Sequence, residues 1–257
     1  MFRFFASLSI VVVLPALPGV VSALAGFADG ERGALWEVVR TCVVNHRVIG
    51  FAFPCLQVTT ADGEERGYVV LRRPGTTDIV LAPTKQVVGV EDTWLRTTEA
   101  PNYFRDAWSA RGFLDELQRS PLGHEDVALA VNSQLLRAQD QLHIHIGCIS
   151  PTARRAIGSV APELTDSDWT RLNWHVHAPA VWARRVSQRS LDGINPFRLA
   201  AGIPDGDAKR APIGIVVAGS ALADGRDSFV ELAWIDDTAK PGGSLTADGL
   251  LDQNCSH

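Results

Sequence analysis

Residues 141–150 read QLHIHIGCIS, and this alternation constrains the fold more than any other part of the chain. Successive side chains of a β-strand point to opposite faces of its sheet. A strand here places His143 and His145 on one face and the apolar residues between them on the other. We expect the apolar face to join the core, and the imidazole face either to hold chemistry or to be solvated.

Other apolar runs come in pairs separated by short turns, which predicts antiparallel hairpins. The paired runs are 67–71 with 78–82, which ends at Pro83, 127–131 with 142–149, and 213–218 with 228–234. Helical spacing of apolar residues predicts helices at 33–44, 104–117, 154–160 and 182–190. Because paired strands alternate with helices, the expected fold class is α+β, an antiparallel sheet with flanking helices.

The N-terminal residues 1–25 differ in kind from the rest. Arg3 is followed by no charged residue until Asp29, and most residues between them are apolar. A basic start, an apolar middle and the ending Ala23-Leu24-Ala25 are typical of an export signal. The stretch is also about long enough to span a bilayer, so an uncleaved N-terminal anchor is the alternative. Either interpretation predicts a folded domain at 26–257, outside the cytoplasm.

Four cysteines, Cys42, Cys55, Cys148 and Cys255, are an even count, which favours disulfides in an oxidising compartment. Three pairings are open. Cys42 and Cys55 would close the shortest loop, and if they pair, Cys148 and Cys255 would join the C-terminal region to the histidine strand. Alternatively, Cys148 is simply a small buried apolar residue. There is no C-x-x-C pair, so the sequence gives little support to a zinc finger.

The net charge of −5 gives no support to a nucleic-acid-binding surface, which needs clustered basic residues. Three interpretations compete for the two imidazoles. They can be incidental, although strict alternation beside Asn132-Ser133 argues against this. They can bind zinc in a non-catalytic exported module, with His175 and His177 as further donors. One imidazole can instead be the nucleophile of nucleotidyl or phosphoryl transfer.

The span 132–150, NSQLLRAQDQLHIHIGCIS, resembles the histidine-triad (HIT) signature, in which histidines alternate with apolar residues. The chain is more closely similar to the bacterial CDP-diacylglycerol pyrophosphatase family. The similarity extends in order through TCVVNHRVIGFAFPC, GYVVL, LAPT and APNYFRDAWSARGFL, and Cys255 also has a counterpart. This resemblance implies a HIT-like fold and hydrolysis of CDP-diacylglycerol to CMP and phosphatidate, with no metal or other cofactor.

The resemblance also implies roles for individual residues. His143 takes the position of the nucleophile, which attacks the phosphate attached to cytidine and forms a covalent CMP-imidazole. His145 takes the position that hydrogen-bonds the phosphate oxygens. Asn132 and Ser133 match ribose and phosphate contacts, and Gln139 is a weaker candidate for the same contacts.

One departure from the HIT pattern is Gln141, which stands where the first histidine is expected. An amide can orient a neighbour, but it cannot donate a proton as an imidazolium does. The leaving phosphate monoester has a second pKa of about 6, so near neutrality it needs little protonation. Lys85 and Arg137 are candidates for neutralising the diphosphate.

The expected partner is a liponucleotide at the membrane surface, on the periplasmic side of the inner membrane. The alternative enzyme is a HIT-type hydrolase or transferase that acts on a soluble nucleotide. The export signal argues against this alternative, because such substrates are mostly cytoplasmic.

Overall fold

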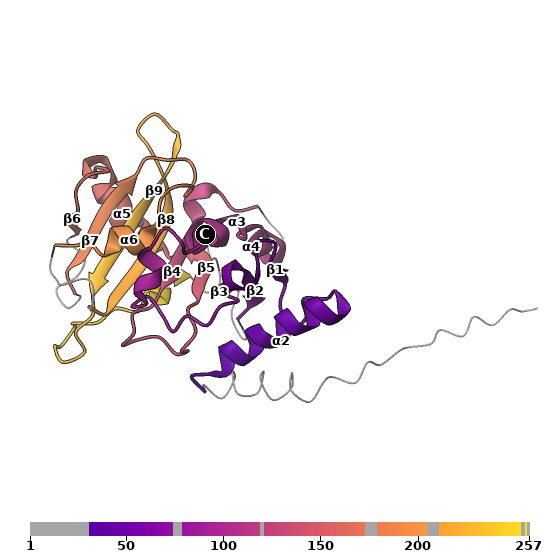
Figure 1. Ribbon diagram of the computed structural model, residues 1–257. Helices are drawn as coiled ribbons and strands as arrows, with labels where there is room; N and C mark the ends of the chain where they lie inside the picture. The colour runs from indigo at the N-terminus through magenta and orange to yellow at the C-terminus, as the bar shows by residue number, and fades with distance from the viewer. Residues whose placement is uncertain are drawn as a thin grey trace, which may run out of the picture.

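The structure is a computed structural model that describes residues 31–73, 79–118, 121–172, 179–204, 211–252 and 255. Within these ranges, ten strands form one sheet in which neighbouring strands are antiparallel. The strand order is β1-β2-β3-β5-β4-β8-β9-β7-β6, and β10 pairs with the end of β5. Helices flank this sheet (Figure 1), so the predicted α+β class is confirmed.

The strands contain the apolar runs that the sequence pairs. β2 with β3, β4 with β5, and β8 with β9 form the three predicted antiparallel pairs. The bounds are β1 Gln57–Thr59, β2 Tyr68–Arg72, β3 Ile79–Pro83, β4 Val127–Val131, β5 Ile144–Ile149, β6 Thr170–Leu172, β7 Val181–Val186, β8 Ile213–Ala221, β9 Asp227–Ile235 and β10 Leu251–Asp252.

The helices begin and end at recognisable signals. Pro151 opens α5, and the hydroxyl of Ser150 caps it by accepting a hydrogen bond from the Ala153 N–H. Gly50, at a φ of 74°, ends α2 in the left-handed conformation that glycine tolerates best. The helices are α2 Ala34–Ile49, α3 Tyr103–Ser109, α4 Gly112–Gln118, α5 Pro151–Val160 and α6 Pro196–Ala200, with short 3-10 turns η1 Glu64–Arg66, η2 Thr93–Arg96, η3 His124–Asp126, η4 Ala161–Glu163 and η5 Asp248–Leu250.

Two helix predictions need correction. The stripe at 104–117 predicts one helix, but the structure has two, α3 and α4, and the second begins at Gly112. Glycine has a low helix propensity, so a helix boundary here costs little. The predicted helix at 182–190 is wrong, because 181–186 form strand β7. Five residues of this segment pair with β9, and these cross-strand contacts outweigh the local helical pattern.

The two faces of the sheet belong to different apolar layers. One face carries Ile144, Ile146 and Cys148 of β5 and packs against α3, α4 and α6. The other face is covered in two separate places, by α2 over β2 and β3 and by α5 over β4, β8 and β9. His145 pairs with Val80 in one of these clusters and with Ala130 in the other. The histidine face of β5 therefore lies at the boundary between two apolar clusters.

Two disulfides tie distant parts of the chain to this framework. Cys42 of α2 is bonded to Cys55, with their Cα atoms 5.8 Å apart. Cys148 of β5 is bonded to Cys255, which is 107 positions further along the sequence, and their Cα atoms are 5.2 Å apart. The second bond holds the C-terminal region against the histidine strand.

Residues 1–25, for which the sequence predicts an export signal or an anchor, lie outside the described residues. In the ranges that are described, no helix combines the length and the apolar character needed to cross a membrane.

Candidate active site

The first histidine of the alternating run lies immediately before β5. The side chain of His143 is largely buried, and the residue is 9% exposed. Its Nδ1 lies 2.8 Å from the backbone carbonyl oxygen of Gln141. A carbonyl oxygen only accepts hydrogen bonds, so Nδ1 must carry the proton of the neutral ring. The lone pair of the neutral imidazole is therefore on Nε2.

The surroundings of His143 keep its ring neutral. Burial, followed by the neighbouring imidazole of His145, lowers the pKa of His143 from 6.5 to about 3. The Gln141 carbonyl and the carboxylate of Asp248 act in the opposite direction but are outweighed. Near neutral pH, Nε2 of His143 is thus an unprotonated nitrogen, which is the form that a nucleophile requires.

His145 lies in β5 and faces the same way as His143. The centroids of the two rings are 4.9 Å apart, and the ring planes meet edge to face at 69°. His145 is buried between its cross-strand neighbours Val80 and Ala130. The structure therefore brings together the two residues that the sequence singles out most strongly.

A carboxylate from the C-terminal region completes this group. The side chain of Asn132, which directly follows β4, accepts a hydrogen bond from the Ala247 N–H at 2.6 Å and donates one to Asp248 Oδ1 at 3.1 Å. The other carboxylate oxygen of Asp248 lies 3.1 Å from Nη1 of Arg73. Asn132 thus holds the η5 turn in place and fixes the orientation of the Asp248 carboxylate.

The charge of Asp248 is stabilised by its neighbours. Burial raises the pKa of this carboxyl group. His145, Asn132 and Arg73 lower it, and their combined effect is larger than that of burial, so the pKa of Asp248 lies below its ordinary value. Asp248 is therefore ionised near neutral pH. The ionised carboxylate therefore interacts electrostatically with the imidazole pair.

Sequence reasoning missed Asp248 and Arg73. Asp248 belongs to the loop-rich segment KPGGSLTADGLL, which carries no local pattern of a functional site. The pairing of β10 with β5 and the Cys148–Cys255 disulfide carry this segment to the histidine strand. The one signal in the sequence that points to this placement is the candidate pairing of these two cysteines.

Ser133 follows Asn132 and is also buried. The hydroxyl of Ser133 affects the pKa of a neighbouring carboxyl group, that of Asp236. Asp236 accepts hydrogen bonds from the Leu245 N–H at 2.8 Å and from Nε1 of Trp234 at 3.1 Å. Burial raises the pKa of Asp236, and the Ser133 hydroxyl acts against this. Ser133 thus lies near the segment that leads to Asp248, and its hydroxyl makes no hydrogen bond among the described residues.

The side chains of Gln141 and Gln139 bind backbone groups. Nε2 of Gln141 donates to the carbonyl oxygens of Pro83 and Lys85, each at 2.9 Å, and Oε1 accepts from the Val87 N–H at 3.2 Å. Oε1 of Gln139 accepts from the Leu35 N–H in the first turn of α2, at 2.9 Å. Both amides hold neighbouring segments against the histidine strand.

The two predicted diphosphate-binding cations have other contacts. Nζ of Lys85 lies 4.2 Å from the ring centroid of Trp94 and 3.5 Å from a carboxylate oxygen of Glu65. Arg137 is bound between Glu91, at 2.8 Å, and Asp140, at 3.1 Å. The contacts of both cations are thus with carboxylates and a tryptophan, and none of these joins them to the two imidazoles.

The zinc interpretation depends on further donors. Among the residues that the structure describes, no group of three or more His, Cys, Asp or Glu side chains could hold a metal ion. His175 and His177, which that interpretation needs, lie outside the described residues. The zinc site stays an untested alternative.

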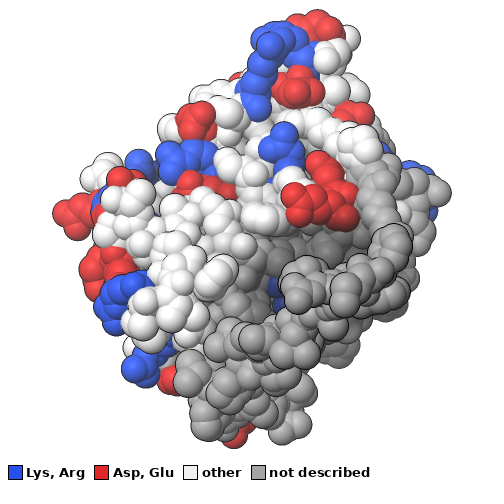
Figure 2. Space-filling model, turned by 90° about the vertical axis from the view of Figure 1, so that its right-hand side faces the viewer, with Lys and Arg blue, Asp and Glu red and all other residues white. Residues whose placement is uncertain are grey.

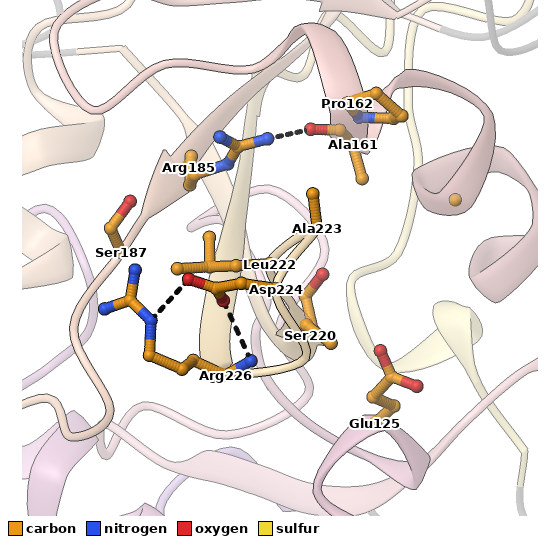
Figure 3. A pocket seen from close by; sticks show the side chains of 12 residues that line it. Glu125, Ala161, Pro162, Arg185, Ser187, Ser220, Leu222, Ala223, Asp224 and Arg226 are labelled. Carbon is orange, nitrogen blue, oxygen red and sulfur yellow. Dashed lines mark hydrogen bonds and ion pairs between the residues drawn. The ribbon is translucent and has the colours of Figure 1, made fainter.

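A hollow of about 700 Å³ lies between η4, β7 and the turn that joins β8 to β9 (Figure 3). Arg226 in this hollow is paired with Asp224 at 2.7 Å, as a dashed line in Figure 3 marks. Ser220 on its wall lies four residues, or about 13 Å, beyond Val216, which is in the same cross-strand row as His145. The hollow is therefore separated from the imidazoles along the direction of the strands and is not part of the same site.

The fold and the site define an α+β protein in which a neutral, buried imidazole lies beside a second imidazole and an ionised carboxylate. A family model described as CDP-diacylglycerol pyrophosphatase matches residues 30–257. The CDP-diacylglycerol pyrophosphatase of Yersinia pestis is 33% identical over 201 residues, which cover 77% of this chain and 74% of that protein. The chain belongs to the CDP-diacylglycerol pyrophosphatase family, and the family resemblance seen in the sequence is confirmed.

Proposed function

We propose that the protein hydrolyses the diphosphate bond of CDP-diacylglycerol and releases CMP and phosphatidate. Membership of the family supports this substrate and this reaction. The observation that carries the chemistry is the neutral ring of His143, whose Nδ1 is bound by the Gln141 carbonyl and whose Nε2 is free of a proton.

The reaction proceeds in two displacements at the phosphorus attached to cytidine. Nε2 of His143 forms a bond to this phosphorus, and the bond to the bridging oxygen breaks, so that phosphatidate leaves. Water then attacks the same phosphorus and loses one proton to the solvent, the electron pair of the breaking nitrogen–phosphorus bond returns to Nε2, and CMP leaves a neutral ring. The Nδ1–H bond to the Gln141 carbonyl stabilises the positive charge that the ring carries in the intermediate.

His145 and Asp248 supply what Gln141 cannot. The amide of Gln141 is bound to the backbone of residues 83–87 and has no acidic proton, so its role is to position the chain. The ionised Asp248 interacts with both imidazoles and stabilises the positive charge that develops on the ring of His143 in the intermediate. His145 hydrogen-bonds the phosphate oxygens and so assists departure of phosphatidate, and Asn132 keeps Asp248 in position.

We also propose that the protein acts on the periplasmic side of the inner membrane. The basic start, the apolar middle and the Ala23-Leu24-Ala25 ending of residues 1–25 support export. The two disulfides support an oxidising compartment, because such bonds persist there and are rare in the cytosol. The HIT-like ancestry of the fold stays a prediction from the sequence pattern.

The function is tested with vesicles that contain CDP-diacylglycerol labelled in its cytidine half. We expect the full chain to release CMP and phosphatidate in equal amounts and to keep this activity in the presence of a chelator. After quenching in base, the label should be on the peptide that contains residues 141–150. Preferential cleavage of a soluble dinucleotide would instead favour the alternative enzyme, and loss of activity to the chelator would favour a metal site.

The pH dependence of the reaction should reflect the low pKa of His143. An ordinary imidazole becomes protonated as the pH falls through 6.5, but His143 stays neutral until the pH approaches 3. We therefore expect kcat/KM to show no loss centred on pH 6.5 that belongs to this residue. The measurement is kcat/KM between about pH 5 and pH 8, since this ratio reports the ionisation of the free enzyme.

Two controls separate this effect from others. Between its folded and unfolded pKa values, the unfolded chain binds the extra proton, so His143 lowers stability as the pH falls below 6.5. Circular dichroism at each pH must therefore show that the protein is folded. The second control is the variant His145→Gln. If kcat/KM of this folded variant still falls around pH 6.5, the prediction for His143 is contradicted.

A further inference from the structure

Large apolar side chains are exposed at the end of α2 and in the loop that leads to β1. Val48 and Phe51 are 71% and 70% exposed, and Phe53 is 63% exposed. Apolar surface of this kind is uncommon as a contiguous group on a soluble protein and marks an interaction site. We define the apolar patch as Val44, Val48, Ile49, Phe51, Phe53 and Leu56.

The segment that carries the apolar patch is held firmly in this exposed arrangement. The Cys42–Cys55 disulfide closes the segment, and Gly50 turns the chain with its N–H bound to the His46 carbonyl oxygen at 3.1 Å. Nδ2 of Asn45 donates to the Phe53 carbonyl oxygen at 2.7 Å. These bonds fix the backbone while the apolar side chains point outward.

The charges around the apolar patch suit an anionic surface. From Glu37 to Asp62 the sequence contains no other acidic residue, although the whole chain has a net charge of −5. The same segment contains Arg40, His46 and Arg47, all exposed. Arg40 pairs with Glu37 at 3.5 Å and Arg47 with Glu64 at 3.2 Å. Both pairs are open to solvent, where such pairs are weak, so the two arginines can exchange these partners for lipid phosphates. Figure 2 shows a broad area without charged side chains on the side of the molecule at which α2 ends in Figure 1.

The helix that carries the apolar patch is bound to the segment before the histidine strand and packs on the neighbouring strand β3. The first turn of α2 is bound to Gln139, two positions before Gln141, and the helix covers the cluster that contains Val80, the cross-strand neighbour of His145. The helix axis from Leu35 to Val48 spans about 20 Å. The apolar patch and the imidazoles thus belong to the same face of the sheet.

We propose that the apolar patch enters the interfacial layer of a lipid bilayer and places the imidazole face against the membrane surface. This inference rests on the proposed function, because the acyl chains of the substrate lie in a bilayer. Protruding valine, isoleucine, leucine and phenylalanine side chains beside basic groups are the combination by which interfacial segments bind anionic lipid. The lipid nature of the substrate favours a bilayer over a second protein copy as the occupant, and no acidic residue lies between Glu37 and Asp62 in the segment that carries the apolar patch.

Hydrogen exchange of the full chain tests the surface itself. Vesicles of phosphatidylethanolamine and phosphatidylglycerol, free of liponucleotide, are the probe. We expect amide exchange over residues 44–56 to slow by about tenfold or more when vesicles are added, because the segment becomes buried in the interface. Exchange over residues 50–56, which follow the end of α2, that vesicles leave unchanged would overturn the proposal.

A double variant, Val48→Ser with Phe51→Ser, tests the consequence for the substrate. Both side chains are largely exposed, so the fold should be unaffected, and Val88→Ser, at an exposed valine outside the apolar patch, is the matched control. We expect the apparent KM for CDP-diacylglycerol in vesicles to rise about tenfold or more in the double variant and to stay unchanged in the control. Turnover of a short-chain, monomeric liponucleotide should be equal in all three proteins.

The two proposals fail in different ways. If the unaltered protein cleaves neither substrate, the proposed function is wrong, and the exchange experiment still decides whether the apolar patch binds lipid. If both substrates are cleaved but the double variant behaves as the control does with vesicles, the function stands and the membrane-binding role of the apolar patch is wrong.

Discussion

Replacing His143 with alanine should reduce the release of CMP from CDP-diacylglycerol by at least about 10⁴-fold, because it removes the atom proposed to attack phosphorus in the first displacement. Alanine leaves the backbone and the carbonyl of Gln141 in place, so the loss measures the ring itself. The measurement is CMP release under steady-state and single-turnover conditions, with labelled substrate and rapid quenching to detect the covalent intermediate.

The matched control is His145→Ala, which removes the other ring of the pair. We expect it to reduce CMP release by about 10² to 10³-fold, as for loss of one group that stabilises charge in the transition state. It should still form labelled protein, whereas His143→Ala should form none. If His145→Ala abolishes labelling and His143→Ala retains it, the roles of the two histidines must be exchanged.

Replacing Cys148 and Cys255 together with alanine should lower the free energy of unfolding by about 4–5 kcal/mol, because it opens a very long loop. The two cysteines are 107 positions apart, so their bond removes much conformational freedom from the unfolded chain. The measurement is urea unfolding of both proteins at equilibrium, with the midpoint and the slope fitted separately.

The other disulfide provides the comparison. Cys42 and Cys55 are 13 positions apart, so their replacement by alanine should cost only about 3 kcal/mol by the same relation. The Cys148 and Cys255 variant should also release CMP more slowly under conditions in which it is folded, because the segment with Asp248 is less firmly held. Equal destabilisation of the two variants, with activity intact in both, would contradict this account.

The parts of the fold that local patterns govern could be predicted from the sequence. The alternation around Ile144 identifies a strand with two faces, and the structure assigns its apolar residues to one core cluster. The hairpins follow from paired β-branched runs because their partners are near in sequence. The orientation of His143 and His145 toward the same side follows from the two-residue period of a strand, and their ring contact agrees with it.

Contacts between segments far apart in sequence could not be predicted in this way. Strand β7 has a local pattern that resembles a helix, and its pairing with β9 overrides that pattern. Arg73 and Asp248 are 175 positions apart and meet only because the sheet and the tail are both in place. The same holds for Gln141, whose side chain looks available for substrate but is bound to backbone groups that the sequence does not identify.

The Cys148–Cys255 bond determines when the site with both imidazoles and Asp248 is complete. Asn132 and Asp248 are 116 positions apart, so a partly synthesised chain contains both histidines well before it contains this carboxylate. In a reducing compartment the covalent link that retains the tail does not form. Assembly of the complete site is thus tied to oxidation of Cys148 and Cys255, which fixes the segment that carries Asp248 against the histidine strand.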